Sequence, residues 1–201
     1  MSKTIKKYNR FSRVYDLFET PVEKHLFSSL RKRVWKRAGG KVLEVGIGTG
    51  KNMPYYPDGV EVTGVDFSRG MLEKARKRKE SLSLENVRLL WMDIEHMRIG
   101  DETFDTAVST FVFCTVPDPL QGLREVYRVL RPGGKAVFLE HMRSRRFVLN
   151  IPLSVMNVFT VPLVGTSMLR ETQKNIEHAG FRIKEVHNVA FDIVRLIIAE
   201  K

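Results

Sequence analysis

A turn built of closely spaced glycines follows the first strongly apolar run of the chain. Gly46, Gly48 and Gly50 come directly after residues 42–45, and Glu44 lies inside that run. Glycine has no Cβ, so such a turn lets a ligand approach the backbone closely. The amides exposed in the turn can also hold polar groups of a ligand. This feature predicts a strand that ends in a ligand-binding turn and then leads into a helix.

The spacing of the glycines does not fit the two best-known phosphate-binding loops. The dinucleotide fingerprint needs a glycine where this chain has Lys51. A P-loop needs Ser or Thr where this chain has Asn52. The carboxylate of Glu44 would repel pyrophosphate and suits an ammonium or sulfonium group. The loop therefore argues against an NAD-dependent oxidoreductase and favours a positively charged ligand.

Short apolar runs alternate with segments of helical periodicity over most of the 201 residues. Buried strands separated by helices form a parallel, doubly wound α/β sheet, and this length is typical of one domain. The last two runs lie close together, which predicts a hairpin with Asn188 in its turn and an added antiparallel strand. The predicted strands are residues 42–45, 60–65, 87–91, 106–110, 135–140, 181–188 and 190–199, and the predicted helices are residues 68–80 and 119–130.

The positive charge is concentrated near the start of the chain. Residues 1–41 contain twelve Lys and Arg against three acidic residues, a net charge of +9, whereas the whole chain carries +11. Residues 5–37 have helical periodicity and Pro21 is expected to start a second helix, so residues 1–40 are expected to form a basic helical arm or lid. Such an arm can attract nucleic acid or an anionic membrane, or it can be a solvated helix face.

Residues 147–169 form a 23-residue segment without a formal charge. It is bracketed by Arg143, Arg145 and Arg146 on one side and Arg170 on the other. Its length alone could span a bilayer. We reject that interpretation because the segment joins the fifth strand to the terminal hairpin of one sheet and is interrupted by two prolines and a glycine. We expect an apolar flap inserted in the domain, or a pocket wall, beside the sheet; simple packing on the sheet is the alternative.

Two acidic residues follow later strands at positions suited to a nucleoside. Asp66 ends the second strand, twenty residues after Gly46, where an acid can accept both ribose hydroxyls. Asp93 follows the third strand, where it can accept an adenine amino hydrogen while Ile94 packs near the ring. Each has an ordinary alternative, a helix cap for Asp66 and a turn former for Asp93. Their order along the chain, after the glycine turn, favours the functional interpretation.

Residues 41–199 resemble the class I S-adenosylmethionine-dependent methyltransferases, with a methyltransferase type 11 domain. The resemblance implies a Rossmann-like seven-stranded sheet whose last hairpin supplies the single antiparallel strand. It also implies S-adenosylmethionine as the cofactor and S-adenosylhomocysteine as its product, with Met71 and Ile94 beside the adenine and Thr110 and Phe111 toward the methionine half. The cofactor-binding residues so implied are Glu44, Gly46, Gly48, Gly50, Asp66, Phe67, Met71, Asp93, Ile94, Thr110 and Phe111.

A narrower resemblance concerns the acceptor. Residues 8–16, which include Tyr15, are similar to the Tyr-Asp lid helix of methyltransferases that act on lipids and quinones. Residues 110–118, together with Glu140 and His141, are similar to a branch that includes bacterial phosphatidylethanolamine N-methyltransferases. The resemblance implies a phospholipid amine as the first acceptor and a quinol carbon as the second. His141 is a candidate base and Tyr15 a second candidate catalytic residue, and a structural histidine at a strand end is the alternative for His141.

The remaining composition narrows the partners. Cys114 is the only cysteine and the five histidines lack helical pairing, so we expect neither a disulfide nor a metal site. No apolar stretch follows the first residues, which is typical of a cytoplasmic protein, here with peripheral contact to the inner face of a membrane through the basic arm. Nucleic acid is disfavoured because aromatic and basic residues are not interleaved. A catalytically silent cofactor-binding module and the oligomeric state stay open.

Overall fold

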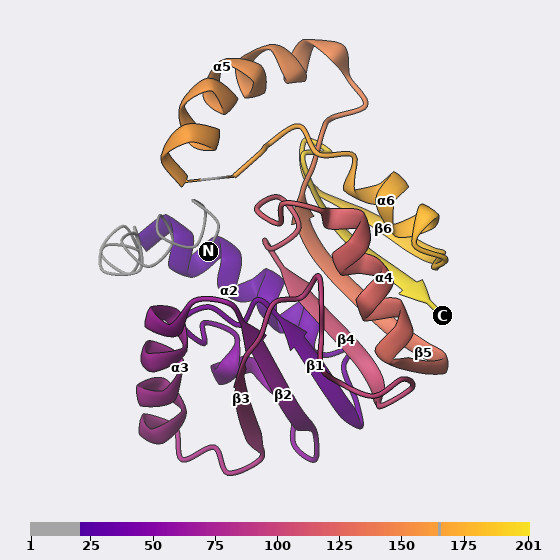
Figure 1. The fold of residues 1–201 in the computed structure, drawn as a ribbon. Helices are drawn as coiled ribbons and strands as arrows, with labels where there is room; N and C mark the ends of the chain where they lie inside the picture. Colours follow the sequence, from indigo (N-terminus) through magenta and orange to yellow (C-terminus); the bar gives the residue numbers. More distant parts are fainter. Residues whose placement is uncertain (1–20, 165) are drawn as a thin grey trace.

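The computed structural model describes residues 21–164 and 166–201. Seven strands form one sheet in the order β3-β2-β1-β4-β5-β7-β6 (Figure 1). Neighbouring strands pair in parallel except β7, which pairs antiparallel with both β5 and β6. The strands are β1 (Lys41–Val45), β2 (Glu61–Asp66), β3 (Val87–Trp91), β4 (Phe104–Thr110), β5 (Leu130–His141), β6 (Arg182–Ala190) and β7 (Val194–Glu200). The predicted doubly wound sheet with an antiparallel last strand is confirmed.

Helices cover both faces of the sheet and bury its alternating side chains. Helices α2 (Pro21–Trp35) and α3 (Arg69–Ser81) pack on the face that carries Val42 and Val108. Helices α4 (Pro119–Val129) and α6 (Thr172–His178) pack on the face that carries Leu43 and Ala107. Because successive residues of a strand point to opposite faces, the near-continuous apolar runs supply two cores at once.

The predicted element boundaries are close to the observed ones, with a few differences. Pro21 begins α2 as predicted, and Ser68 caps α3 by accepting a hydrogen bond from the amide of Met71. The fifth strand begins earlier than predicted because Leu130 already pairs with Phe104. Helix α6 and the short 3-10 helix η2 (Met53–Tyr55) were not predicted, because each is too brief to show helical periodicity.

The predicted position of the terminal turn is wrong. Asn188 is not in the turn but pairs with Arg195 within the ladder. The chain reverses at Phe191 and Asp192, whose φ angles of 45° and 62° lie in the left-handed region. Asn188 was predicted because Asn is tolerated in that region, but so is Asp, and the pairing register of the hairpin places Asp192 in the turn.

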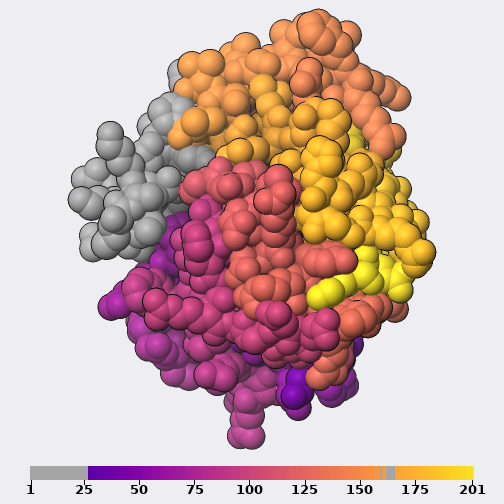
Figure 2. Space-filling view, turned by 45° about the vertical axis from the view of Figure 1, so that its right-hand side comes forward, coloured from indigo at the N-terminus to yellow at the C-terminus, as the bar shows by residue number. Residues whose placement is uncertain are grey.

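Within the segment 147–169, residues 147–164 form helix α5 (Phe147–Val164), and residues 166–169 lie in the connector that leads to α6. The helix lies beyond the carboxyl edge of the sheet, at the top of Figure 1, and its orange atoms form the raised upper rim of the molecule in Figure 2. Among the described residues, no helix is both long and apolar enough to cross a membrane. The other flanking segment, residues 1–20 of the basic arm, lies outside the described residues, and Tyr15 with it.

Candidate functional site

A cavity of about 280 Å³ opens at the carboxyl edge of the sheet, where β1, β2 and β4 end side by side. From β1 the chain builds the sheet outward through β2 and β3 on one side, and then crosses back to form β4 on the other side of β1. Ligands of α/β sheets bind at such a switch point. The predicted site residues that line the cavity are Gly46, Gly48, Asp66, Phe67, Met71, Asp93, Ile94, Thr110, Phe111 and His141. Glu44 and Gly50 were also predicted but do not line it.

The glycine turn forms one wall of the cavity. Gly46 and Gly48 have φ angles of 61° and 57°, a region that side chains with a Cβ rarely adopt. A Cβ on Gly46 would lie 2.6 Å from Val112 Cγ2, so this glycine allows the turn to pack against the loop after β4. A Cβ on Gly48 would point into open space, with Gly46 O the nearest atom at 3.9 Å. The backbone at Gly48 is therefore open to a ligand.

Gly50 packs beneath the turn, and its predicted contact with the cofactor stays a prediction. Its φ is 78°, and a Cβ there would lie 2.8 Å from Met53 Cε. Met53 is 2% exposed, so the third glycine lets the turn close over this buried side chain. The glycine is required by packing beneath the turn and does not face the cavity.

Asp66 connects the end of β2 to the glycine turn. Its Oδ2 accepts a hydrogen bond from the amide of Gly48 at 2.9 Å, and its Oδ1 accepts one from the amide of Ser68 at 2.8 Å. Burial raises the pKa of Asp66 to about 6, although both hydrogen bonds act in the opposite direction. A carboxylate has more lone pairs than these two amides use, so it can still accept hydrogen bonds from ligand hydroxyls.

The loop after β3 supplies the opposite wall. Asp93 is exposed in the cavity, and its Oδ1 accepts a hydrogen bond from the amide of Glu95 at 3.0 Å. Ile94 is buried and lines the same space, as does Met71 from the first turn of α3. An apolar slot with a carboxylate at its rim is what a planar base with an exocyclic amine requires.

Asp93 also belongs to a small cluster with Glu95 and His96, whose ligand atoms all lie within 4.8 Å of one another. Asp93 and His96 are exposed, and Glu95 Oε1 already accepts a hydrogen bond from the amide of Asp118. Exposed acidic groups of this kind are common without an ion. The expectation that the protein has no metal site stays a prediction.

Glu44 lies behind the glycine turn instead of facing a ligand. It is 1% exposed and accepts hydrogen bonds from Asn52 Nδ2 at 2.6 Å and from the hydroxyl of Tyr56. Burial raises the pKa of Glu44 to about 7. The carboxylate holds Asn52, which does line the cavity, whereas Glu44 itself does not. The predicted contact of Glu44 with a ligand stays a prediction.

Arg31 and Asn52 are cavity residues that the sequence analysis missed. The guanidinium Nη1 of Arg31 donates to Asn52 Oδ1 at 2.7 Å, and Asn52 Nδ2 donates to Thr110 Oγ1 at 2.9 Å. Arg31 was counted only as one of the positive charges of the basic arm, because nothing in a helical pattern distinguishes one arginine from its exposed neighbours Lys32 and Arg33. Asn52 offered a weak signal, since it is a polar residue close behind the glycine turn.

The loop after β4 is held in place by a second buried carboxylate. Glu140 is fully buried and accepts hydrogen bonds from Ser109 Oγ at 2.6 Å and from the amides of Val112 and Phe113 at 3.0 and 3.2 Å. Burial raises the pKa of Glu140 to about 7. Phe111, just before these amides, has a φ of 59°. The carboxylate thus compensates a strained turn that directs Phe111 into the cavity.

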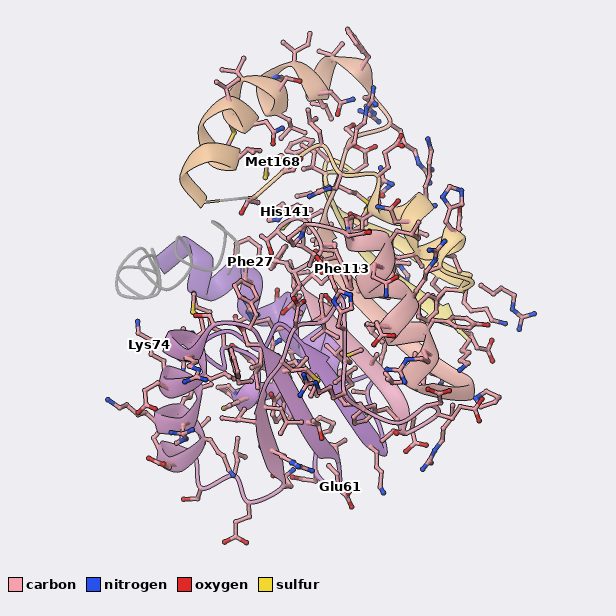
Figure 3. All side chains as sticks on the ribbon, viewed as in Figure 1. Phe27, Glu61, Lys74, Phe113, His141 and Met168 are labelled. Carbon is pink, nitrogen blue, oxygen red and sulfur yellow. The ribbon has the colours of Figure 1, made fainter. Side chains whose placement is uncertain are left out.

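Aromatic side chains form the remaining part of the cavity wall. The ring of Phe111 lies 4.6 Å from the His141 ring and 5.2 Å from the Phe27 ring, centroid to centroid. In Figure 3, Phe27 from α2 and His141 from the end of β5 lie at the same edge of the sheet, below Met168 and helix α5. Burial lowers the pKa of His141 to about 4, so its imidazole is neutral near pH 7. Among the described residues of segment 147–169, only Thr166 lines this cavity.

Comparison with known proteins agrees with this geometry. A family described as a methyltransferase domain matches residues 43–138. A phosphatidylethanolamine N-methyltransferase of Cereibacter sphaeroides is 47% identical over 104 residues, which are 51% of this chain and 51% of that protein. The chain thus matches only about half the length of that relative.

Two further relatives align over more of their length. The Homo sapiens thiol S-methyltransferase TMT1A is 31% identical over 86% of this chain and 72% of its own. A demethylmenaquinone methyltransferase of Staphylococcus aureus is 34% identical over 79% of this chain and 68% of its own. Among solved structures, a methyltransferase of Thermotoga maritima superposes with a TM-score of 0.75 at 23% identity, covering 98% of this chain and 99% of that chain, which shows a shared fold.

Proposed function

Because the chain belongs to the class I S-adenosylmethionine-dependent methyltransferases, we propose that it methylates a small apolar or lipid-like acceptor, with a phospholipid amine of the phosphatidylethanolamine type as the first candidate. The observation that carries the proposal is the cavity at the switch point. One end of the cavity offers glycine amides and two carboxylates, and the other end is aromatic and low in charge. The two ends correspond to a cofactor and an apolar acceptor.

The residues at the first end fit S-adenosylmethionine. This cofactor supplies a methyl group bonded to a positively charged sulfur. The open backbone at Gly48 would contact the cofactor. Asp66 would accept hydrogen bonds from its ribose hydroxyls, and Asp93 would accept one from the amino group of its adenine. Met71 and Ile94 would cover the two sides of the base. These assignments follow from the position of each group on the cavity wall.

Arg31 extends the cofactor end toward the aromatic end. Its guanidinium lines the cavity at the level of Asn52 and Thr110, where a carboxylate of the methionine half would lie. Guanidinium groups pair well with carboxylates because their N–H donors match the two oxygens. Together with the buried Glu44, which orients Asn52, this chain of contacts would fix the orientation of the reacting methyl group.

The aromatic end suits an acceptor that must lose a proton. Phe27, Phe111 and His141 form an aromatic wall that would limit the access of water to the reacting groups. The neutral imidazole of His141 can accept a hydrogen bond from an N–H of the acceptor and pass the proton to solvent. Tyr15, the other candidate catalytic residue, lies outside the described residues.

The relatives support different acceptor atoms. The phosphatidylethanolamine N-methyltransferase supports nitrogen, and the demethylmenaquinone methyltransferase supports a quinol carbon as the second candidate. The thiol S-methyltransferase makes a thiol sulfur a third acceptor atom to be tested. We place nitrogen first because the identity to that relative is the highest of the three, although it covers half of each chain.

The proposal is tested by turnover with methyl-labelled cofactor. Purified protein would be incubated with phosphatidylethanolamine in detergent micelles, a demethylated quinol, an alkyl thiol and RNA, with an Asp66→Ala variant as the inactive control. We expect label in the phospholipid. Label only in the quinol or the thiol would replace the first candidate, and label only in RNA would overturn the proposal. Binding of S-adenosylhomocysteine without turnover on any acceptor would favour a catalytically silent module.

A further inference from the structure

Helix α5 exposes its apolar side chains to an unusual degree. Phe147 and Val148 are 75% and 72% exposed, and Val158 is 68% exposed. The other large apolar residues of the helix that are exposed are Ile151, Val155, Met156 and Val161. At 100° per residue all of these except Met156 fall on one side of the helix. A soluble protein rarely presents such a continuous apolar strip to water.

The polar side chains of the same helix point the other way. Asn150 is 8% exposed and forms two hydrogen bonds of 3.0 Å with the backbone of Ser144. Asn157 accepts a hydrogen bond from the amide of Met168 at 2.9 Å, and Thr160 donates one to Thr166 O at 2.9 Å. These contacts attach the helix to its own flanking segments. The inner side also carries the buried Leu153, so the helix is apolar on both sides and its outer side is not the polar face expected of a helix that faces water.

The exposed hydroxyl of Ser154 also has a hydrogen-bond partner within the helix. Ser154 donates to the carbonyl of Asn150 at 2.8 Å. Groups satisfied within the helix or by its flanks carry little cost when water is replaced by hydrocarbon. Transfer of the outer face of α5 from water into an apolar environment would therefore leave none of these polar groups without a hydrogen-bond partner.

Positive charge is placed at one end of this face. Residues 147–169 carry no formal charge, whereas Arg143, Arg145 and Arg146 directly before the helix are exposed. A hollow of about 520 Å³ at the foot of the helix is lined by Arg143, Arg145, Lys174 and Arg195, together with Glu171 and Glu177. Apolar side chains that continue into a cluster of arginines match the acyl layer and the phosphates of an anionic bilayer.

The connector that follows the helix reaches the cavity. The helix and the cavity are both at the carboxyl edge of the sheet, and Thr166, in the connector that follows α5, lines the cavity (Figures 1 and 3). A surface that lay against α5 would thus also lie near Phe27 and His141. An acceptor taken from that surface would have a short path to the aromatic end of the cavity.

From these observations we propose that α5 docks the protein on an anionic lipid bilayer, with its outer face in the acyl layer and Arg143, Arg145 and Arg146 on the lipid phosphates. The inference rests on the proposed function, since it names the surface from which the site takes its acceptor. The arginines favour a bilayer over a second copy of the chain, because a second copy carries the same net charge of +11, whereas an anionic bilayer carries the opposite charge.

Vesicle binding by the full chain tests this docking. We expect sedimentation with vesicles of phosphatidylcholine mixed with phosphatidylglycerol, and much weaker sedimentation with phosphatidylcholine alone. Ile151→Asp should weaken binding to the mixed vesicles about tenfold, because it places a charge in the acyl layer. Leu82→Asp is the matched control, since Leu82 is an exposed apolar residue at the end of α3. Equal binding by Ile151→Asp and Leu82→Asp would overturn the proposal.

A label on the helix distinguishes a bilayer from other occupants. Val155→Cys can be labelled selectively with an environment-sensitive fluorophore, because Cys114 is only 2% exposed. We expect the fluorophore to report a polar, water-exposed environment in solution and an apolar environment when mixed vesicles are added. A fluorophore that already reports an apolar environment without vesicles would overturn the proposal, because a second copy or residues of the same chain would then cover the helix. Sedimentation velocity would distinguish these two cases.

Activity in micelles separates this inference from the proposed function. Ile151→Asp should keep wild-type turnover of phosphatidylethanolamine in detergent micelles while losing vesicle binding. Vesicle binding by a wild-type protein that methylates no phospholipid would refute the acceptor and leave the docking intact. Phospholipid methylation without vesicle binding would refute the docking alone.

Discussion

The amide nitrogen of Gly48 lies 2.9 Å from Oδ2 of Asp66, so one hydrogen bond joins the glycine turn after β1 to the end of β2. The two residues are 18 positions apart in the chain but occupy the same wall of the cavity. The carboxylate also accepts the amide of Ser68, which caps α3. Asp66 therefore sets the shape of the cofactor end of the cavity as well as offering acceptors to a ligand.

Asp66→Asn should weaken binding of S-adenosylhomocysteine by at least about tenfold, because the ligand hydroxyls lose a carboxylate acceptor. It should also lower the free energy of unfolding by about 1–3 kcal/mol, because one of the two backbone amides loses its acceptor. Calorimetric titration and denaturant unfolding measure both effects. Asp105→Asn is the control, since Asp105 accepts the amide of Lys41 at 2.8 Å away from the cavity. Asp105→Asn should cost stability without changing affinity, and equal affinity in both variants would contradict the assignment.

Much of this arrangement was predictable from the sequence. The parallel strands are near-continuous apolar runs, and the turn glycines and Asp66 follow such runs directly, so their meeting at one edge follows from topology. The role of Glu44 was not predictable, because whether the carboxylate faces the cavity or the core depends on Tyr56 and Asn52, which approach it from η2 and its flanks. Sequence periodicity contains no information on such contacts.

Helix α5 shows a second limit. Its residues 147–169 were predicted to be a flap or wall because they carry no formal charge, and the structure contains a helix whose outer face is apolar and exposed. Which side of the helix is exposed could not be predicted from the sequence, because it depends on the hydrogen bonds of Asn150 and Asn157 with the backbone of the flanking segments. Arg31 was missed for the same reason, since its partner Asn52 lies 21 residues away.

Gly48→Ala should separate cofactor binding from folding. Its φ of 57° makes an alanine cost about 1–2 kcal/mol of stability, and the added methyl group would project into the cavity. Gly133→Ala is the matched control, because Gly133 has a φ of 73° and a methyl group added there would have no atom within 4 Å. Both variants should lose similar stability in thermal unfolding. Only Gly48→Ala should lose affinity for S-adenosylhomocysteine, and unaltered affinity would show that the ligand does not approach this turn.

The buried Glu44 should make stability depend on pH. Its pKa is raised from 4.5 to about 7, so folding favours the protonated form. The resulting stability is fully present below about pH 4.5 and is lost as the pH rises through about 7, by about 3 kcal/mol. In Glu44→Gln, which cannot ionise, the free energy of unfolding should fall less over this range. Denaturant unfolding at several pH values measures the difference.

Tyr56→Phe provides the companion test for Glu44. The Tyr56 hydroxyl donates to the carboxylate and lowers its pKa, against the larger effect of burial. Removing the hydroxyl should therefore shift the loss of stability to higher pH. A shift to lower pH, or parallel pH profiles for the wild type and Glu44→Gln, would show that Glu44 is not the titrating group.

His141 should remain neutral across the range in which histidines ordinarily titrate. Burial lowers its pKa to about 4, so the Hε1 chemical shift in NMR spectra should stay flat between about pH 5 and pH 8, with His141→Gln identifying the signal. If the neutral ring accepts a proton from the acceptor, His141→Gln should lower kcat about a hundredfold and leave the affinity for S-adenosylhomocysteine unchanged. A titration midpoint near pH 6.5 would show that burial does not lower the pKa of His141. A wild-type kcat in His141→Gln would show that the ring only packs against Phe111 and has no part in the reaction.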